Sequence, residues 1–394
     1  MADAPLKGVR VLELARILAG PWAGQTLADL GADVIKVENP DGGDDTRAWG
    51  PPFIKGADGD ELDAAYYHGV NRNKRSVTAD LKSAAGQELV RRLVRQSDIL
   101  IENFKTGGLA KYGLDYESLK TLNPKLIYCS ITGFGHTGPD AALAGYDFIV
   151  QGMSGLMSIT GEADGLPMKT GVAVADLFTG IYSVIGILAA LRHAEATGQG
   201  QHIDMALLDT QAGVLANQNM NYLATGISPK RIGNENPNIV PYEVVAASDG
   251  HVILAVGNDG QFERACKILA LEALPADPRF ATNEARVENR VLLRTLIAPA
   301  AAKFTKKDLL AACEANAVPV GTINTIGEMF EEPQIKARGL RIDLKDFEGN
   351  AIPGVRTPIM MSQTPLRYET PSPRLGQHTD EVMAELARLE ADKK

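Results

Sequence analysis

Residues 9–38, VRVLELARILAGPWAGQTLADLGADVIKVE, contain two short apolar runs separated by a helical pattern. The runs VRVLEL and DVIKVE have the β-branched composition of buried strands, and TLADLG between them indicates a helix. The alternation continues with a helical pattern at 87–96 and strand-like runs at 98–103 and 126–135. Strands that alternate with helices predict a parallel sheet with helices on its faces, so the first half of the chain is predicted to be an α/β domain.

The second half departs from this pattern. A strand-like run at 201–209 leads into a stretch that predicts a connecting helix ending at Gly226. Asp249-Gly250 then separates two strand-like segments, 242–247 and 251–256, which predicts a hairpin. This region is predicted to form an α+β unit. Further helices are expected near 261–270, near 291–304 and, after a proline-rich extended tail, over 378–394.

The amino-acid composition limits which classes of protein and of binding partner fit this chain. The 394 residues are 45% hydrophobic and 23% charged, as in a globular protein of about two domains. A net charge of −9 disfavours nucleic acid and anionic membranes as partners, although local cations can still bind a small anion. The three cysteines form no CxxC pair, so neither a disulfide framework nor a zinc site is predicted.

The same sequence carries no signal-peptide pattern at its start, and its apolar stretch 177–191 is short for a membrane helix and interrupted by Thr179, Gly180 and Ser183. We therefore expect a cytoplasmic protein in which that stretch is a buried helix. No GxGxxG, GxxxxGK[ST], GxSxG or HExxH spacing occurs, which argues against nicotinamide or flavin binding, against nucleotide hydrolysis, and against serine-hydrolase or zinc-protease chemistry.

Three predicted loops gather cations. They are GGDDTRAWGPP with Arg47, NRNKRS with Arg72, Lys74 and Arg75, and ENFKTGGLAKYG with Lys105 and Lys111. Each cation taken singly fits a solvated surface charge. Taken together in an acidic protein, they favour a ligand that carries several phosphates.

Asp176 is a lone carboxylate at the start of the apolar helical segment GVAVADLFTGIYSVIGILAALR. One interpretation is an N-cap, in which the carboxylate accepts a backbone N–H. The other is a nucleophile that partial burial shields from water while the helix N-terminus keeps it ionised. The tract AVGNDGQF (255–262) is similarly open to two interpretations, a plain turn or a mobile glycine loop over a reacting centre.

The blocks LAGPWAGQTLADLGADVIKVE, GDDTRAWGPP, NRNKRSVTADL, ENFKTGGLAKYGL, GHTGP and GYDFIVQGMSGLMSITG, followed by the Asp176 helix, resemble the class III coenzyme A transferases (CaiB/BaiF) in the same order. The resemblance covers nearly the whole chain. It implies a large Rossmann-like α/β domain built from 1–210 and 325–394, a linker helix at 211–232 and an inserted small α+β domain at 233–324. It also implies an intertwined homodimer of interlocked rings.

The resemblance assigns roles to individual residues. Asp176 matches the family's catalytic aspartate, and Gly257, Gly260 and Gln261 match its glycine-rich active-site loop. Coenzyme A, bound as an acyl-CoA substrate, is the one cofactor implied, with no metal, nicotinamide or flavin. The positions implied for its binding are Arg16, Ile17, Leu18, Asn39, Arg72, Lys74, Arg75, Asn103, Phe104, Lys111, Tyr112 and Tyr146.

Three departures narrow the substrate. Leu18 stands where formyl-CoA transferases have Gln, and Asn39 stands where the family has an arginine, which disfavours formyl-CoA and oxalate. Tyr146 stands where the related α-methylacyl-CoA racemases have histidine, and a phenol with a pKa of about 10 is a poor base at neutral pH. Racemisation therefore ranks behind transfer, and a noncatalytic CoA-binding regulator remains a third alternative.

GDDTRAWGPP and NPNIVPY look most like the subgroup that uses dicarboxylates, such as the succinyl-CoA:glutarate transferases. The resemblance implies that Asp176 attacks an acyl-CoA to form a mixed anhydride and then a CoA thioester. Amides of Gly257–Gln261 are the expected oxyanion donors. Arg47, with Tyr146, is expected to bind the carboxylic acid substrate.

Overall fold

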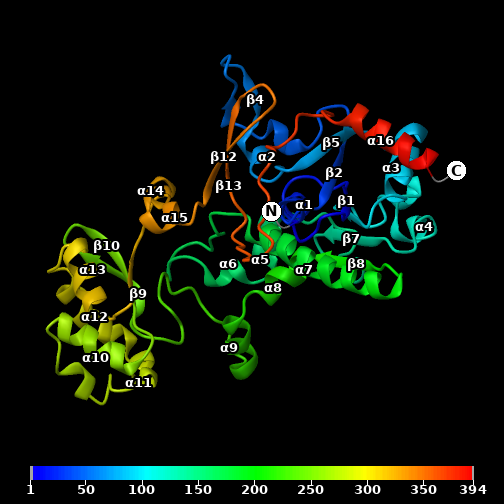
Figure 1. Ribbon diagram of the computed structural model, residues 1–394. Helices are drawn as coiled ribbons and strands as arrows, with labels where there is room; N and C mark the ends of the chain where they lie inside the picture. Colours follow the sequence, from blue (N-terminus) through cyan, green and yellow to red (C-terminus); the bar gives the residue numbers. More distant parts are fainter. Residues whose placement is uncertain (1–2, 393–394) are drawn as a thin grey trace. The chain divides into compact units, whose positions relative to one another are not determined.

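A computed structural model describes residues 3–392. The chain forms two compact units (Figure 1). The larger unit combines residues 3–156, Lys169–Met220 and 334–392, and the smaller combines Met157–Met168 and Asn221–Pro333. The first linker, expected as one helix over 211–226, is instead two helices, α8 (Leu207–Gly213) and α9 (Asn217–Thr225). Ala216 between them has a φ of +48°, which a continuous helix does not allow.

A six-stranded sheet forms the centre of the larger unit, in the order β5-β2-β1-β6-β7-β8. Every neighbouring pair is parallel, with register such as Leu12 opposite Ile35 and Leu100 opposite Tyr128. The predicted parallel α/β architecture is therefore confirmed. The strands are β1 (Arg10–Glu13), β2 (Asp33–Glu38), β5 (Lys74–Thr78), β6 (Ile99–Glu102), β7 (Ile127–Thr132) and β8 (His202–Ala206).

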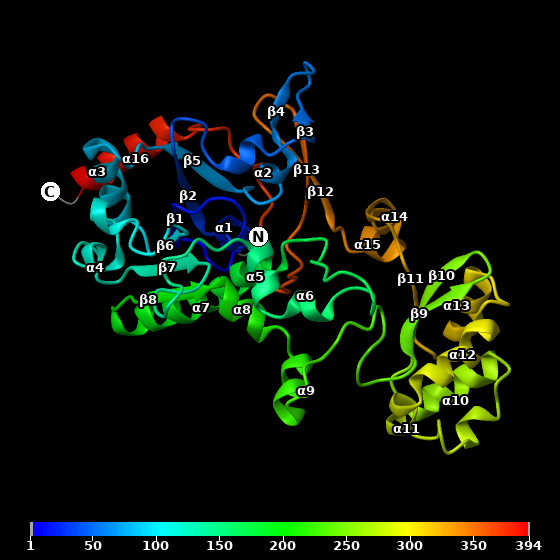
Figure 2. The ribbon, with the colours of Figure 1, turned by 180° about the vertical axis from the view of Figure 1, so that it is seen from behind.

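Alternate strand residues build two cores, one on each face of the sheet. Val11 and Ile101 face α1 (Ala19–Asp29) and α7 (Val174–Thr197), whereas Leu12 and Leu100 face α3 (Ala84–Val94) and α16 (Thr379–Ala391). Figure 2 shows the sheet between these two helical layers. The period of two in the strands thus accounts for the three-layer arrangement.

Shorter elements complete the larger unit. They are η1 (Asp45–Ala48), β3 (Phe53–Lys55), β4 (Glu61–Ala64), α2 (Ala65–His68), η2 (Ala110–Tyr112), α4 (Tyr116–Leu119), α5 (Asp147–Met153), β12 (Arg341–Lys345) and β13 (Ala351–Val355). The helices α6 (Leu156–Ile159) and α15 (Pro333–Ala337) lie where the chain passes between the units.

The C-terminal tail joins the larger unit at the edge strand β5. The His378 amide donates to the Ser76 carbonyl, and the Asn73 amide donates to the Thr370 carbonyl. Both chain ends therefore build this unit. The C-terminal helix, expected over 378–394, ends at Ala391, and residues 393–394 lie outside the described part of the chain.

The smaller unit contains a three-stranded sheet in the order β11-β10-β9. The predicted hairpin is confirmed, because β9 (Tyr242–Ala247) and β10 (Gly250–Ala255) pair antiparallel across Asp249-Gly250. Helices pack on this sheet around Val252, Phe262 and Leu293. The remaining elements are α10 (Asp259–Ile268), η3 (Leu274–Ala276), α11 (Asn283–Glu288), α12 (Arg290–Ala301), α13 (Lys306–Ala315), β11 (Val320–Thr322) and α14 (Ile326–Glu331).

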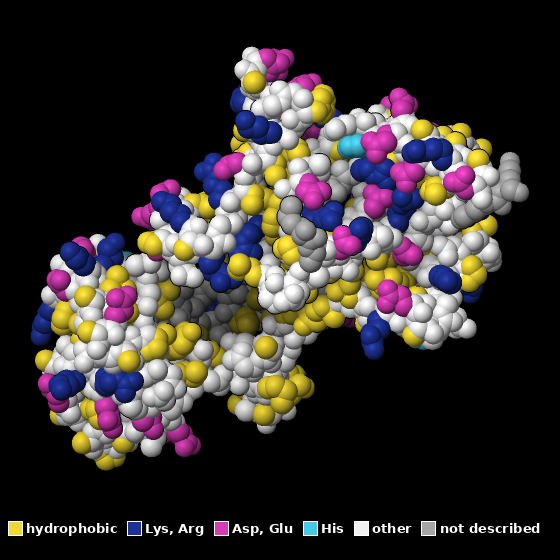
Figure 3. Space-filling view, viewed as in Figure 1, with side chains coloured by type: hydrophobic (Ala, Val, Ile, Leu, Met, Phe, Trp, Pro, Cys, Tyr) yellow, Lys and Arg dark blue, Asp and Glu magenta, His cyan; other side chains and the backbone are white. Residues whose placement is uncertain are grey.

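Helix α7 is only half buried, contrary to the expectation of a buried helix. One side packs on α1, where a Cβ added at Gly180 would lie 2.7 Å from the Ala19 carbonyl oxygen. The other side exposes large apolar side chains, Phe178, Ile181, Tyr182 and Ile185. By length and composition α7 could cross a membrane, a property that core helices of soluble proteins share. Figure 3 shows acidic and basic side chains intermingled over the face that it presents.

Candidate active site

A cavity of about 470 Å³ lies in the larger unit at the carboxyl ends of three parallel strands. Its walls are the segments that follow β1, β6 and β7, together with the start of α7. The chain leaves β1 toward β2 on one side and later returns to β6 on the other, so the cavity lies where the strand order reverses. Open α/β sheets bind ligands at such a point. The predicted site residues that line it are Arg16, Ile17, Leu18, Asn103, Phe104, Lys111, Tyr112, Tyr146 and Asp176.

Asp176 lies in the first turn of α7 and does not cap the helix. The cap is supplied by Asp147, whose carboxylate accepts the Ala175 amide at 2.8 Å and the Asp176 amide at 3.3 Å. Within residues 3–392, no hydrogen bond reaches the Asp176 carboxylate itself. The N-cap interpretation is therefore wrong, and the carboxylate is left facing the cavity.

Burial raises the pKa of Asp176 to about 7, and the like charge of Asp147 adds to the rise. The expected burial is present, but the expectation that the helix N-terminus keeps the group ionised holds only in part, because a pKa of about 7 leaves a large fraction protonated at neutral pH. A carboxylate with a raised pKa is a better nucleophile than an ordinary aspartate, although a smaller fraction of it is ionised at neutral pH.

The loop after β6 is fixed by polar contacts to the loop after β1. The Asn103 side-chain amide accepts the Arg16 amide at 2.9 Å and donates to the Arg16 carbonyl at 2.7 Å. Beside it, the Glu102 carboxylate accepts the Phe104 amide at 2.8 Å, and burial raises the pKa of Glu102 to about 7. Asn103 and Phe104 are thereby held in one orientation at the cavity wall.

Three cations line the cavity. Arg16 pairs with Asp45 at 2.6 Å, whereas Lys105 and Lys111 are exposed and make no ion pair within the described part of the chain. The Lys111 ammonium lies 4.8 Å from the centre of the Tyr112 ring. Two unpaired ammonium groups at one wall can bind phosphate oxygens.

The cations of NRNKRS do not line this cavity. Arg72 forms a buried bidentate pair with Asp29, and Lys74 pairs with Glu13, both within the core of the unit. Arg75 pairs with Asp33 and Glu385 and so ties β5 to α16. Contrary to the expectation, all three side chains are held by carboxylates of the same unit and none lines the cavity. Asn39 also lies outside the cavity. Its side-chain oxygen accepts the Asp41 amide at 3.1 Å.

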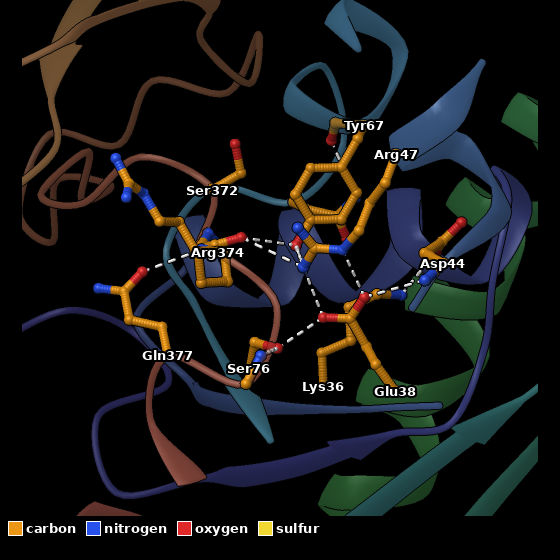
Figure 4. A network of polar contacts seen from close by, with 12 residues as sticks. Lys36, Glu38, Asp44, Arg47, Tyr67, Ser76, Ser372, Arg374 and Gln377 are labelled. Carbon is orange, nitrogen blue, oxygen red and sulfur yellow. Dashed lines mark hydrogen bonds and ion pairs between the residues drawn. The ribbon is translucent and has the colours of Figure 1, made fainter. Parts of the chain in front are cut away.

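Arg47 was expected to bind the carboxylic acid substrate. It is instead only 6% exposed and lies outside the cavity. Figure 4 shows its guanidinium stacked beside Tyr67, 3.8 Å from the ring centre, and hydrogen-bonded to the Glu38 carboxylate. It also pairs with Asp63 at 2.5 Å. A guanidinium neutralised and enclosed in this way has no open face for a substrate carboxylate.

The predicted loop Gly257–Gln261 belongs to the smaller unit. The Gln261 side-chain oxygen accepts the Gly257 amide at 2.7 Å, and the Asn258 side chain caps α10 by accepting the Gln261 amide. Neither Gly257 nor Gly260 has a positive φ, and an added Cβ would meet only ordinary contacts at each. Neither backbone conformation nor packing therefore requires a glycine at these two positions in this structure.

Two residues that interact with Asp176 were missed from the sequence. Asp147, within the quoted GYDF motif, is the first residue of α5 and caps α7, 28 residues later in the chain, so no local pattern reveals this contact. Tyr66 carries no sequence signal either. Burial raises its pKa to about 12, with added contributions from the charges of Asp176, Asp147 and Asp44, so this phenol stays protonated.

Residues 6–379 match the family model described as CoA-transferase family III. The chain belongs to this family. It is therefore a CoA-transferase, as the sequence predicted. It is 69% identical to the succinate–glutarate CoA-transferase of Agrobacterium fabrum, over 98% of this chain and 96% of that one.

Family III relatives are also found farther away. The chain is 40% identical to the succinyl-CoA:glutarate CoA-transferase of Homo sapiens, over 98% of this chain and 87% of that one. A crystal structure of a CaiB/BaiF family protein from Brucella suis, 58% identical, matches with a TM-score of 0.87 and covers 98% of this chain and 100% of that one. The predicted family is confirmed.

Proposed function

We propose that this CoA-transferase moves coenzyme A from succinyl-CoA to glutarate or a similar dicarboxylate, with Asp176 as the nucleophile. The substrate pair is supported by the 69% identity to the succinate–glutarate enzyme over nearly the full length of both chains. The role of Asp176 is supported by one observation above all: Asp176 lines the cavity, and Asp147 rather than Asp176 caps α7.

The proposed reaction has four balanced steps. The Asp176 carboxylate attacks the succinyl thioester carbonyl, forming an aspartyl–succinyl anhydride and releasing CoA thiolate. The thiolate attacks the aspartyl carbonyl, which releases succinate and leaves an aspartyl–CoA thioester. Glutarate attacks that thioester to form an aspartyl–glutaryl anhydride and thiolate, and the thiolate then takes the glutaryl group and frees Asp176.

In this proposal, other residues bind coenzyme A, contact the acid substrate or stabilise an oxyanion. Lys105 and Lys111 bind phosphates of coenzyme A, while Asn103 and Phe104 border its pantetheine arm. For the Gly257 amide to stabilise an oxyanion, the Gln261 side chain has to release it first. Tyr146, which is 60% exposed at the rim, remains a proposed substrate contact, whereas Arg47 does not.

We also propose that the protein works as a cytoplasmic homodimer. The exposed side of α7 carries Phe178, Ile181, Tyr182 and Ile185 at helical spacing. An apolar stripe of this kind is uncommon on a soluble monomer and suits a second copy of the same chain. The resemblance to class III transferases points to the same assembly.

Mass spectrometry of CoA esters tests the proposal. The wild type and the Asp176→Asn variant are each incubated with succinyl-CoA and one acceptor acid at a time: glutarate, adipate or butyrate. We expect glutaryl-CoA from the wild type, less product from the monocarboxylate, and none above background from the variant. Transfer that survives in the variant, or α-proton exchange in deuterated water without any acceptor, would contradict the proposal.

A further inference from the structure

Ile17, in the cavity wall, has a backbone conformation that isoleucine rarely adopts. Its φ is +72°, in the left-handed region, and its side chain is β-branched. In that region the Cβ of an L-residue is crowded, and a branched residue is a clear outlier. Such strain persists only where surrounding contacts enforce it, and it concentrates at functional sites.

The enforcing contact comes from Asp44. Its carboxylate accepts the Ile17 amide with both oxygens, at 3.2 and 3.3 Å. The same carboxylate is 1% exposed and is anchored by the Thr46 amide at 3.0 Å and the Thr46 hydroxyl at 2.8 Å. The acceptor for the strained peptide is therefore itself immobile.

Lys36 completes this arrangement from the neighbouring strand. Its ammonium is fully buried and lies 2.9 Å from Asp44, 2.9 Å from Glu13 and 2.7 Å from the Ala15 carbonyl oxygen. Figure 4 shows Lys36 and Asp44 side by side at this point. A single cation thus holds both the Asp44 carboxylate and the peptide two residues before Ile17.

The loop held in this way leads directly to the nucleophile. Leu18 and Ala19 line the same cavity as Asp176, and α1 begins at Ala19. Ala19 lies against Gly180, one turn after Asp176 on α7. The conformation of Ile17 therefore sets where α1 begins in the cavity that Asp176 also lines.

We propose that Asp44, fixed by Lys36, is a positioning residue that keeps Ile17 left-handed and so shapes the acyl end of the cavity for CoA transfer. This inference rests on the proposed function of the site. It does not assign Asp44 or Lys36 a contact with substrate. Their effect is carried by the backbone of residues 15–19.

A double-mutant cycle between Asp44→Asn and Ile17→Gly tests this inference. Glycine adopts positive φ readily, so it should not need the Asp44 contact. We expect Asp44→Asn to lower kcat by roughly ten- to a hundredfold in the wild-type background, with KM for succinyl-CoA changing far less. In the Ile17→Gly background the same change should cost no more than about twofold, whereas the same loss in both backgrounds would overturn the proposal.

Two additions keep the test decisive. If Asp44→Asn does not fold, Thr46→Val loosens the same carboxylate more gently, and the same cycle with Ile17→Gly applies. Hydrogen exchange of a peptide spanning 15–20 gives a readout without activity: Asp44→Asn should speed exchange and Asp346→Asn, a carboxylate in the β12–β13 turn, should not. Unchanged exchange in Asp44→Asn refutes the positioning role even if transfer itself fails.

Discussion

The raised pKa of Asp176 makes the activity depend on pH in a definite direction. Only the ionised carboxylate attacks a thioester, and burial raises its pKa to about 7. We therefore expect kcat/KM to rise with pH, to pass through an inflection near pH 7 and to level off above it. Initial rates of CoA exchange from pH 5 to 9 measure this profile, and a rate that is flat from pH 5.5 upward would contradict the assignment.

Asp147 provides the matching variant for that profile. Asparagine at 147 can still accept the Ala175 amide, so α7 keeps its cap, but the like charge beside Asp176 is lost. The inflection should move to lower pH. Asp204→Asn, which changes a carboxylate that accepts the His136 amide outside the cavity, should leave the inflection in place.

At the residue scale, the sequence identified cavity residues better than it identified cations. Asp176, Asn103 and Lys111 were found from motifs, and they line one cavity. Arg47, Arg72 and Lys74 do not line it, because each is buried and paired with a carboxylate, as buried Lys and Arg usually are. Partners such as Asp29 and Glu13 are more than 40 residues from Arg72 and Lys74 in sequence, so no local pattern reveals those pairs.

At the scale of elements, α1 packs against a buried carboxylate. A Cβ added at Gly24 would lie 1.8 Å from the Glu13 carboxylate, which also pairs with Lys36 and Lys74. Although alanine normally favours a helix, Gly24→Ala should destabilise the protein by roughly 1–3 kcal/mol because the carboxylate has to leave its partners. Thermal unfolding at matched protein concentration measures this as a lower midpoint.

Gly186→Ala in α7 is the matched control. Its added Cβ would meet Ile203 at 3.5 Å, an ordinary contact. There the helix propensity of alanine should dominate, with a gain of up to about 1 kcal/mol. Equal shifts in the two variants would show that the Glu13 contact does not govern the packing of α1.

Elements were predicted where the period of apolar residues was clear. Five of the six parallel strands and the β9–β10 hairpin follow from strand-like runs in the sequence, whereas β5 (Lys74–Thr78) begins within NRNKRS, which was predicted as a loop. The break at Ala216 was missed because nothing in ANQN signals a positive φ. The exposed side of α7 was missed because an apolar helix in a core and one at an interface have the same composition.

At the scale of the whole molecule, the apolar side of α7 predicts self-association. If no second copy covers α7, the double variant Ile181→Asp/Ile185→Asp should change the free energy of unfolding little, because both side chains are exposed in the subunit. If a second copy covers them, the charges should dissociate the dimer and lower the activity. Sedimentation equilibrium should then give two subunits for the wild type and one for the double variant, whereas a monomeric wild type would refute the dimer.

The central claim is that Asp176 carries the transferred group, and peptide mass spectrometry tests it most directly. Trypsin should release residues 170–192 as one peptide, in which Asp176 is the sole Asp or Glu. After incubation with succinyl-CoA alone and an acid quench, we predict that this peptide gains the mass of coenzyme A less water, and that hydroxylamine releases the coenzyme A and leaves a hydroxamate on Asp176. A peptide of unchanged mass in a protein that still exchanges CoA would contradict the account.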